Sequence, residues 1–235
     1  MKPVRMETLI SFSGIDGAGK STQIASLRDS LSSRGWKVAQ IAFWDDAAVF
    51  ARFRAGVTLR VLPTQPKSAE EPPLRRDKNV SAWYLTLIRS VFYALDALRL
   101  RAVVARTAKS GTDFIILDRW TYDQLVHIKS RTRFARAYIR IVFALAPSPD
   151  LPLLLDASPD DAFRRKPEYP LAFLHEYRQA FLALKEFVPK LQIISHGPID
   201  EVRHRILATV LSNSCENLAK SGVGEPRTKL ISNSP

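Results

Sequence analysis

The chain has one cysteine, Cys215, and only four histidines among its 235 residues. A single cysteine cannot form an internal disulfide and cannot supply the paired thiolates of a zinc site. The scattered histidines argue against a histidine-rich metal centre. The longest apolar run, residues 141–147, is far shorter than the ~18 residues that cross a bilayer. The apolar segment after the basic start is too short for a signal peptide, so we expect a cytoplasmic protein without a membrane span.

Acidic residues are also in deficit, with 23 Asp and Glu against 35 Lys and Arg and a net charge of +12. This excess favours anionic partners such as nucleotides, nucleic acid or a membrane surface. The hydrophobic fraction, 46%, and the charged fraction, 25%, are ordinary for a globular chain. A chain of this length suits one α/β domain with a substantial core better than two small ones.

The apolar pattern predicts strands and helices in alternation, which favours a parallel sheet flanked by helices. We expect one domain over residues 1–212, a proline-rich polar loop at 63–80 and a disordered tail at 213–235. The expected strands are residues 8–13, 38–43, 114–117, 151–155 and 191–194. The expected helices are residues 20–34, 47–61, 82–109, 133–146, 160–165, 171–187 and 200–211.

Glycine is scarce too, and three of the nine fall within six positions, between the first expected strand and helix. The segment Gly14–Ser21 reads GIDGAGKS and matches G-x-x-x-x-G-K-[ST]. In this motif backbone N–H groups surround phosphates, the lysine supplies charge to the β and γ oxygens, and the serine hydroxyl ligates Mg²⁺. The pattern predicts ATP and Mg²⁺ as cofactors. The residues expected to contact them are Gly14, Asp16, Gly17, Ala18, Gly19, Lys20, Ser21 and Thr22.

Asp118 directly follows the apolar strand at 114–117. A carboxylate at the end of a parallel strand lies at the edge where open α/β sheets bind ligands, and it could hold Mg²⁺ through water. A helix cap in a solvated turn is the alternative, because Thr121 begins a helical pattern.

Three segments resemble motifs of the thymidylate kinase family: GIDGAGKST at 14–22, Asp118-Arg119-Trp120 after the strand, and PDLPLLLDASP at 149–159. The resemblance covers about residues 6–212. It implies a P-loop NTPase-type three-layer fold with a five-stranded parallel sheet and a lid. It also implies ATP-dependent phosphoryl transfer to a nucleoside monophosphate, with Asp16 near the acceptor and Mg²⁺ and with Arg119 on the acceptor phosphate.

The resemblance places the lid at about residues 158–170. Family members without an arginine in the phosphate loop carry the catalytic arginine in the lid. The loop of this chain has none, so Arg164 or Arg165 is the candidate, with Lys20 and Asp16 as the other catalytic residues. A solvated helix face, paired with Asp160 and Asp161, is the alternative for these arginines.

The acceptor region departs from the family pattern. The usual Glu-Pro-Gly is replaced by residues 43–46, FWDD, in which Trp44 could stack on a planar ring and Asp45 could face the acceptor. Asp96 has no arginine beside it, and Arg89, about two helical turns earlier, is the nearest candidate on that face. Two alternatives therefore stay open: a kinase for the hydroxyl of a nucleoside, sugar or other metabolite, and a non-catalytic ATP-binding protein.

Residues 99–140 hold ten Lys and Arg against three Asp. One interpretation of this charge is a surface that binds nucleic acid or a membrane. A solvated helix face is the favoured interpretation, so nucleic acid is not an expected partner. The apolar stripe of the helix at 133–146 suits the core or a contact in a homodimer. Trp44 and Trp120 flank the expected site and could stack on a ligand.

Overall fold

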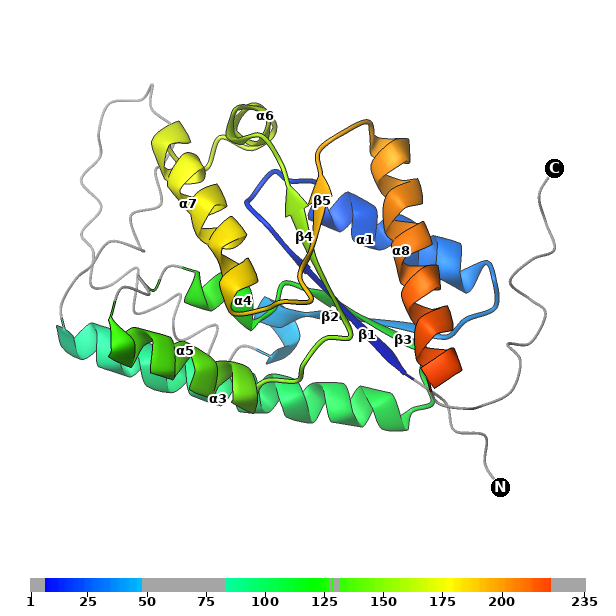
Figure 1. Ribbon diagram of the computed structural model, residues 1–235, viewed down its shortest axis with the longest axis horizontal. Helices are drawn as coiled ribbons and strands as arrows, with labels where there is room; N and C mark the ends of the chain where they lie inside the picture. Colours follow the sequence, from blue (N-terminus) through cyan, green and yellow to red (C-terminus); the bar gives the residue numbers. More distant parts are fainter. Residues whose placement is uncertain (1–6, 48–82, 127, 129–131, 221–235) are drawn as a thin grey trace.

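The computed structural model describes residues 7–47, 83–126, 128 and 132–220, and Figure 1 shows how they are arranged. Their side chains are described except at residues 47, 83–89 and 217–220. Five parallel strands form one sheet in the order β2-β3-β1-β4-β5. The strands are β1 (Thr8–Ser13), β2 (Val38–Ala42), β3 (Phe114–Asp118), β4 (Leu151–Asp156) and β5 (Gln192–Ser195).

Helices cover both faces of this sheet. The described helices are α1 (Lys20–Ser32), α3 (Trp83–Lys109), α4 (Thr121–Leu125), α5 (Arg133–Leu145), α6 (Pro159–Arg165), α7 (Leu171–Ala183) and α8 (Ile199–Lys220). Helices α1 and α8 pack on one face, whereas α3, α5 and α7 pack on the other (Figure 1). The predicted three-layer α/β fold is confirmed.

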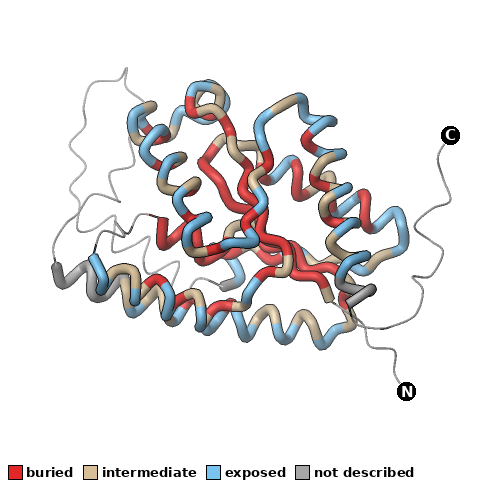
Figure 2. Tube along the Cα trace, in the orientation of Figure 1, coloured by how far each residue is buried: buried red, intermediate tan, exposed pale blue. Residues whose placement is uncertain are grey.

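Strand alternation divides the core into two clusters. On β1, Ile10 and Phe12 point to the cluster beneath α1 and α8, whereas Leu9 points to the cluster beneath α3 and α5. The three central strands, β1, β3 and β4, form a buried band between the helices (Figure 2), whereas the edge strands β2 and β5 are partly exposed. Strands buried on both faces are typical of parallel sheets, which explains why the apolar runs in the sequence are nearly unbroken.

The sheet register aligns the carboxyl ends of the three central strands. Phe12 of β1 pairs with Asp118, the last residue of β3, and Ser13 pairs with Leu154 of β4. Loops that leave these strands therefore meet at one edge of the sheet, where open α/β sheets bind ligands.

Most boundaries differ from the sequence prediction by one or two residues at most, and three regions differ in other ways. Strand β2 ends at Ala42, and a π-helical turn, η1 (Phe43–Ala47), follows. Helix α7 ends at Ala183, where the tighter turn η2 (Leu184–Glu186) begins. Helix α8 continues to Lys220 rather than ending near 211, so the tail expected from 213 begins as helix.

The sequence permits this extension of α8, because no glycine or proline interrupts residues 199–220. Within the extension, the Ser214 hydroxyl donates a hydrogen bond to the Val210 carbonyl one turn earlier (2.9 Å). The rest of the expected tail, the expected helix beyond residue 47 and the polar loop at 63–80 lie outside the described residues. Among the helices that the structure describes, none is both long and apolar enough to cross a membrane.

Replacing Ile10 by alanine should lower the free energy of unfolding by about 2–5 kcal/mol, because a fully buried side chain on the central strand would leave a cavity. Chemical denaturation of the purified chain measures this change. Phe134, which is 89% exposed, provides the control, and Phe134→Ala should change stability by less than about 0.5 kcal/mol. Equal decreases in the free energy of unfolding of the two variants would contradict the assignment of Ile10 to the core.

Candidate functional site

The loop between β1 and α1 depends on two of its glycines for close packing. Gly14 and Gly17 have φ values of 142° and 86°. A Cβ atom at Gly14 would lie 2.5 Å from the Leu155 carbonyl oxygen, and one at Gly17 would lie 2.5 Å from that of Ala162. The loop therefore packs closely against the end of β4 and against α6, and its glycines leave the loop backbone without side-chain atoms at these positions.

Lys20, the first residue of α1, lies inside this loop and is only 7% exposed. Its Nζ donates hydrogen bonds to the carbonyl oxygens of Gly14 and Ile15, both at 2.8 Å. Burial, together with the nearby positive charge of Arg119, lowers the pKa of Lys20 to about 8. The amine of Lys20 is therefore mainly protonated at neutral pH. A positive charge inside a glycine-rich loop is an arrangement that suits a phosphate group.

Ser21 and Asp118 lie beside this loop. Ser21 is exposed at the start of α1. Asp118 is partly exposed at the end of β3, close enough to Lys20 for its charge to raise the pKa of the lysine. Within the described part of the chain, no group of three or more His, Cys, Asp or Glu side chains could bind a metal. The donors present fit Mg²⁺, which usually takes one or two protein ligands together with phosphate oxygens and water.

Arg119 is the one described residue other than glycine with a positive φ, 69°. Its backbone N–H donates to the Phe12 carbonyl (3.1 Å). Its guanidinium forms ion pairs with Asp16 of the loop and with Asp123 of α4. Burial by itself would lower the pKa of Arg119, but the carboxylates of Asp123 and Asp16 outweigh it and raise the pKa above its ordinary value.

Asp123 was not identified from the sequence. It is 4% exposed and accepts hydrogen bonds from the Ser13 hydroxyl (2.8 Å) and the Trp120 backbone N–H (3.3 Å). Burial raises the pKa of Asp123, and the positive charges of Arg119 and Lys20 oppose that shift. The sequence does contain an indication of this pair, because Asp123 follows Arg119 by four residues, the spacing of an ion pair along a helix.

The two tryptophans considered for ligand stacking differ in position. Trp120 is buried, packs against Tyr122 and Phe143, and donates from Nε1 to the Pro147 carbonyl (3.1 Å). It is a core residue, so the stacking interpretation is wrong there. Trp44, in η1, is 44% exposed.

The rest of η1 carries two exposed carboxylates, those of Asp45 and Asp46. A carboxylate oxygen of Asp46 accepts a hydrogen bond from the Ala42 N–H (2.8 Å) and closes the turn. In α3, Asp96 is fully buried and accepts a hydrogen bond from Nε2 of Gln124 (2.6 Å). Arg89 belongs to α3, but its side chain lies outside the described residues.

The structure separates the two arginines of the expected lid. In α6, Nη1 of Arg165 donates to the Gly17 carbonyl (3.3 Å), so this guanidinium lies on the phosphate loop. The Arg164 side chain is 74% exposed and pairs with Asp161. Asp161 also lies near Nε2 of His196 (3.4 Å), which joins α6 to the segment after β5.

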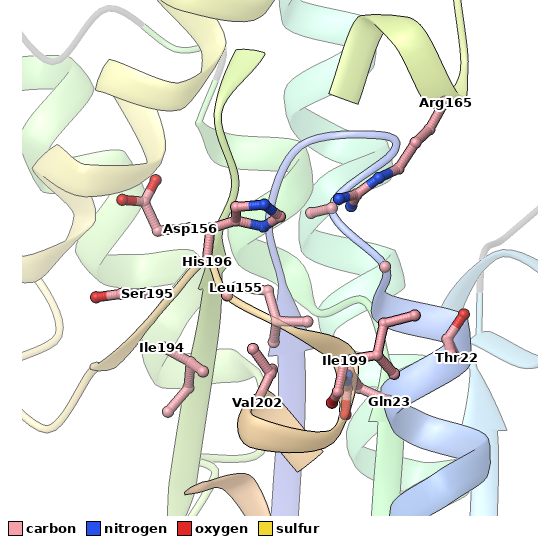
Figure 3. Close-up of a pocket in the computed structure, with 13 residues that line it drawn as sticks. Thr22, Gln23, Leu155, Asp156, Arg165, Ile194, Ser195, His196, Ile199 and Val202 are labelled. Atoms are coloured by element: carbon pink, nitrogen blue, oxygen red, sulfur yellow. The ribbon is translucent and has the colours of Figure 1, made fainter. Parts of the chain in front are cut away.

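A pocket of about 190 Å³ adjoins the phosphate loop, between α1, the ends of β4 and β5, and the start of α8. Figure 3 shows Arg165 pointing from α6 toward the loop and His196 on the opposite wall. The lining is largely apolar, with Leu155, Ile194 and Val202 among its residues. It suits a flat ring with few polar atoms, attached to a phosphate chain held by the loop.

Asp156, at the end of β4, lines this pocket and is held in place by α7. Arg178 donates two hydrogen bonds to its carboxylate, at 2.5 and 2.7 Å. Arg178, Ser195 and His196 belong to no local sequence motif, so none of them was expected at this site.

Comparisons with known proteins agree with this geometry. No protein-family model matches the chain. It is 30% identical over 175 residues to the thymidylate kinase of Chlorobaculum tepidum, covering 72% of each chain. It is 25% identical over 207 residues to a probable thymidylate kinase of Methanosphaera stadtmanae, covering 84% of this chain and 96% of the relative. It is 24% identical over 211 residues to a probable thymidylate kinase of Archaeoglobus fulgidus, covering 87% and 95%.

Alanine at Gly17 should be more damaging than alanine at Gly19. Both positions have a positive φ, which costs an ordinary residue about 1–2 kcal/mol. Only at Gly17 would the new methyl group also overlap the backbone of α6, because a Cβ at Gly19 meets nothing within 4 Å. Denaturation of the two variants should therefore show the larger loss for Gly17→Ala, and equal losses would show that the loop does not pack on α6 in solution.

Proposed function

Because the chain belongs to the thymidylate kinase family, we propose that it transfers the γ-phosphoryl group of ATP to a nucleoside monophosphate. The observation that carries this proposal is the pairing of two cationic sites at one sheet edge. Lys20 occupies the phosphate loop, and Arg119 lies beside it, close enough that its charge lowers the pKa of the lysine. One site suits the donor phosphates and the other suits an acceptor phosphate.

The donor half of the site fits ATP with Mg²⁺. The bare backbone of the loop and the buried ammonium of Lys20 would surround the β and γ phosphates, with Gly14, Gly17, Ala18, Gly19 and Thr22 completing the cradle. Ser21 and Asp118 would hold the ion, which when bound neutralises charge on the phosphate oxygens. The adjoining apolar pocket would take the base of the nucleotide.

The acceptor half is organised around Arg119. Its planar guanidinium can bind a phosphate through two parallel hydrogen bonds. An incoming phosphate would compete for it with the carboxylate of Asp16, which would then be available to the acceptor or to the hydrated ion. Trp44 and Asp45 are exposed on η1, after β2, and we assign them, with Arg89, to acceptor recognition. We expect dTMP to be a poor acceptor, because this turn replaces the Glu-Pro-Gly of the family.

Arg165 is the better candidate for the catalytic arginine of the lid. It already lies on the phosphate loop, whereas Arg164 points to Asp161. A guanidinium at that position can neutralise negative charge that develops on the transferred group. The alternative, phosphoryl transfer to an unphosphorylated hydroxyl, has less support. Such a reaction would use the carboxylates of Asp45 and Asp46 to orient the hydroxyl, and that of Asp46 instead closes the η1 turn.

We also propose a homodimer that forms through α3. This helix exposes Val91, Leu95 and Leu98. They are separated by four and then three residues, a spacing that is typical of apolar contacts between two helices. On α5, Val142 is buried in the core, whereas Phe134 and Ile141 remain exposed.

An acceptor screen tests the proposed function. The full chain is incubated with ATP, Mg²⁺ and each of the ribo- and deoxyribonucleoside monophosphates, and ADP release and the diphosphate product are measured. We expect turnover with at least one monophosphate. The turnover rate should fall by ~100-fold or more in Lys20→Ala, because the loop loses its positive charge. The exposed Lys109 gives the matched control, and Lys109→Ala should behave as the wild type. Turnover only with an unphosphorylated alcohol, or wild-type rates in Lys20→Ala, would contradict the proposal.

The two lid arginines should differ in steady-state kinetics. Arg165→Ala should lower kcat by ~10³-fold or more, the range for arginines that stabilise phosphoryl transfer, and should change the KM for ATP far less. Arg164→Ala removes a solvated side chain that pairs within its own helix and should leave kcat within about twofold. The opposite ranking would assign the catalytic role to Arg164, and unchanged kcat in both would leave α6 as a solvated surface.

A further inference from the structure

The backbone at Arg119 adopts a conformation that side chains other than glycine rarely take. Such a residue persists only where its surroundings fix it. The backbone N–H of Arg119 is bound to Phe12, and the neighbouring Trp120 is anchored in the core through its ring and Nε1. The turn that carries the guanidinium is thus held firmly on both sides, and the orientation of the side chain depends on its carboxylate partners.

Asp123 joins three parts of the site. Its carboxylate accepts hydrogen bonds from the hydroxyl of Ser13 at the end of β1, from the backbone N–H of Trp120, and from Nη1 of Arg119. It is almost completely buried. A buried carboxylate is strongly unfavourable unless it is paired and hydrogen-bonded, and these contacts give Asp123 such a set of partners.

The two carboxylates on Arg119 differ in what holds them. Asp16 contacts Nη2 and belongs to the phosphate loop, and its side chain is the more exposed of the two. Asp123 contacts Nη1 and is fixed independently by Ser13 and Trp120. Because its side chain is the more exposed of the two, Asp16 is the carboxylate that an anion entering the site meets first, at Nη2.

We propose that Asp123 is a positioning residue that holds Arg119 through Nη1 and leaves the Nη2 edge for the acceptor phosphate. The inference rests on the proposed function and extends it.

Kinetics of Asp123→Asn provide the first test, with the monophosphate that gives the highest turnover in the acceptor screen. The amide has the same shape but neither the charge nor the second acceptor oxygen. The KM for that monophosphate should rise by about tenfold or more, while the KM for ATP stays within about twofold. Asp150→Asn is the matched control, because Asp150 accepts a backbone hydrogen bond at the opposite end of β1 (2.8 Å). It should leave both KM values unchanged. Equal rises in both KM values of Asp123→Asn would overturn the proposal.

A double-mutant cycle separates positioning from general damage. If Asp123 acts through Arg119, adding Asp123→Asn to Arg119→Ala should not raise the KM for the monophosphate further. Effects that add in the double variant would show that Asp123 acts independently of Arg119. If Asp123→Asn does not fold, Ser13→Ala removes one anchor of the carboxylate without a change of charge and should shift the same KM in the same direction.

A measurement without any acceptor distinguishes this inference from the proposed function. The full chain is labelled with ¹⁵N-arginine, and the Nε–H resonance of Arg119 is identified by its absence in Arg119→Lys. Hydrogen exchange of this group should be slow in the wild type and in Asp150→Asn, and at least about tenfold faster in Asp123→Asn. Unchanged exchange would overturn the role of Asp123 even if the enzyme is active. Faster exchange in a chain that phosphorylates no monophosphate would leave that role standing while the proposed function fails.

Discussion

Four ionisable side chains that meet at one sheet edge determine how this site is built; Lys20, Asp16 and Asp123 are buried and Arg119 is partly exposed. Lys20 and Arg119 are basic, Asp16 and Asp123 are acidic, and they influence one another's protonation. Charges in a low-dielectric interior interact strongly and are costly when unpaired. The geometry of the surrounding turns is therefore constrained by the need to keep every one of these groups paired or hydrogen-bonded.

The sheet makes this concentration of charge possible. Parallel strands place the ends of β1 and β3 side by side, so that the phosphate loop and the turn at Arg119 leave the sheet at the same level. The bare backbone at Gly14 and Gly17 lets the loop approach β4 and α6 closely. Tight packing around the loop reduces the access of water, which strengthens the interactions of Lys20 and Arg119 with an anion.

Helix α6 and the segment after β5 help to enclose the pocket beside the phosphate loop. Arg165 lies on the loop, and the contact between Asp161 and His196 joins α6 to the far wall of the pocket. The loop after β1, helix α6 after β4 and the segment after β5 are far apart in the sequence, and they are adjacent because β1, β4 and β5 are consecutive in the sheet. The same arrangement turns Arg164 away into solvent, which distinguishes two residues that the sequence presents as equivalent.

The sequence by itself determined the parallel α/β fold, the phosphate loop and the carboxylate after β3, because each depends on a local pattern of apolar, glycine or charged residues. It also predicted most element boundaries, although η1, the end of α7 and the extension of α8 differ from the prediction. Only the tertiary structure decided which arginine of α6 lies on the loop, that Trp120 is a core residue and that Asp123 joins the site. Those roles depend on contacts between segments such as β1 and α4, which are distant in the sequence. A local pattern records which side chains are present, and the packing of the sheet edge determines which of them meet.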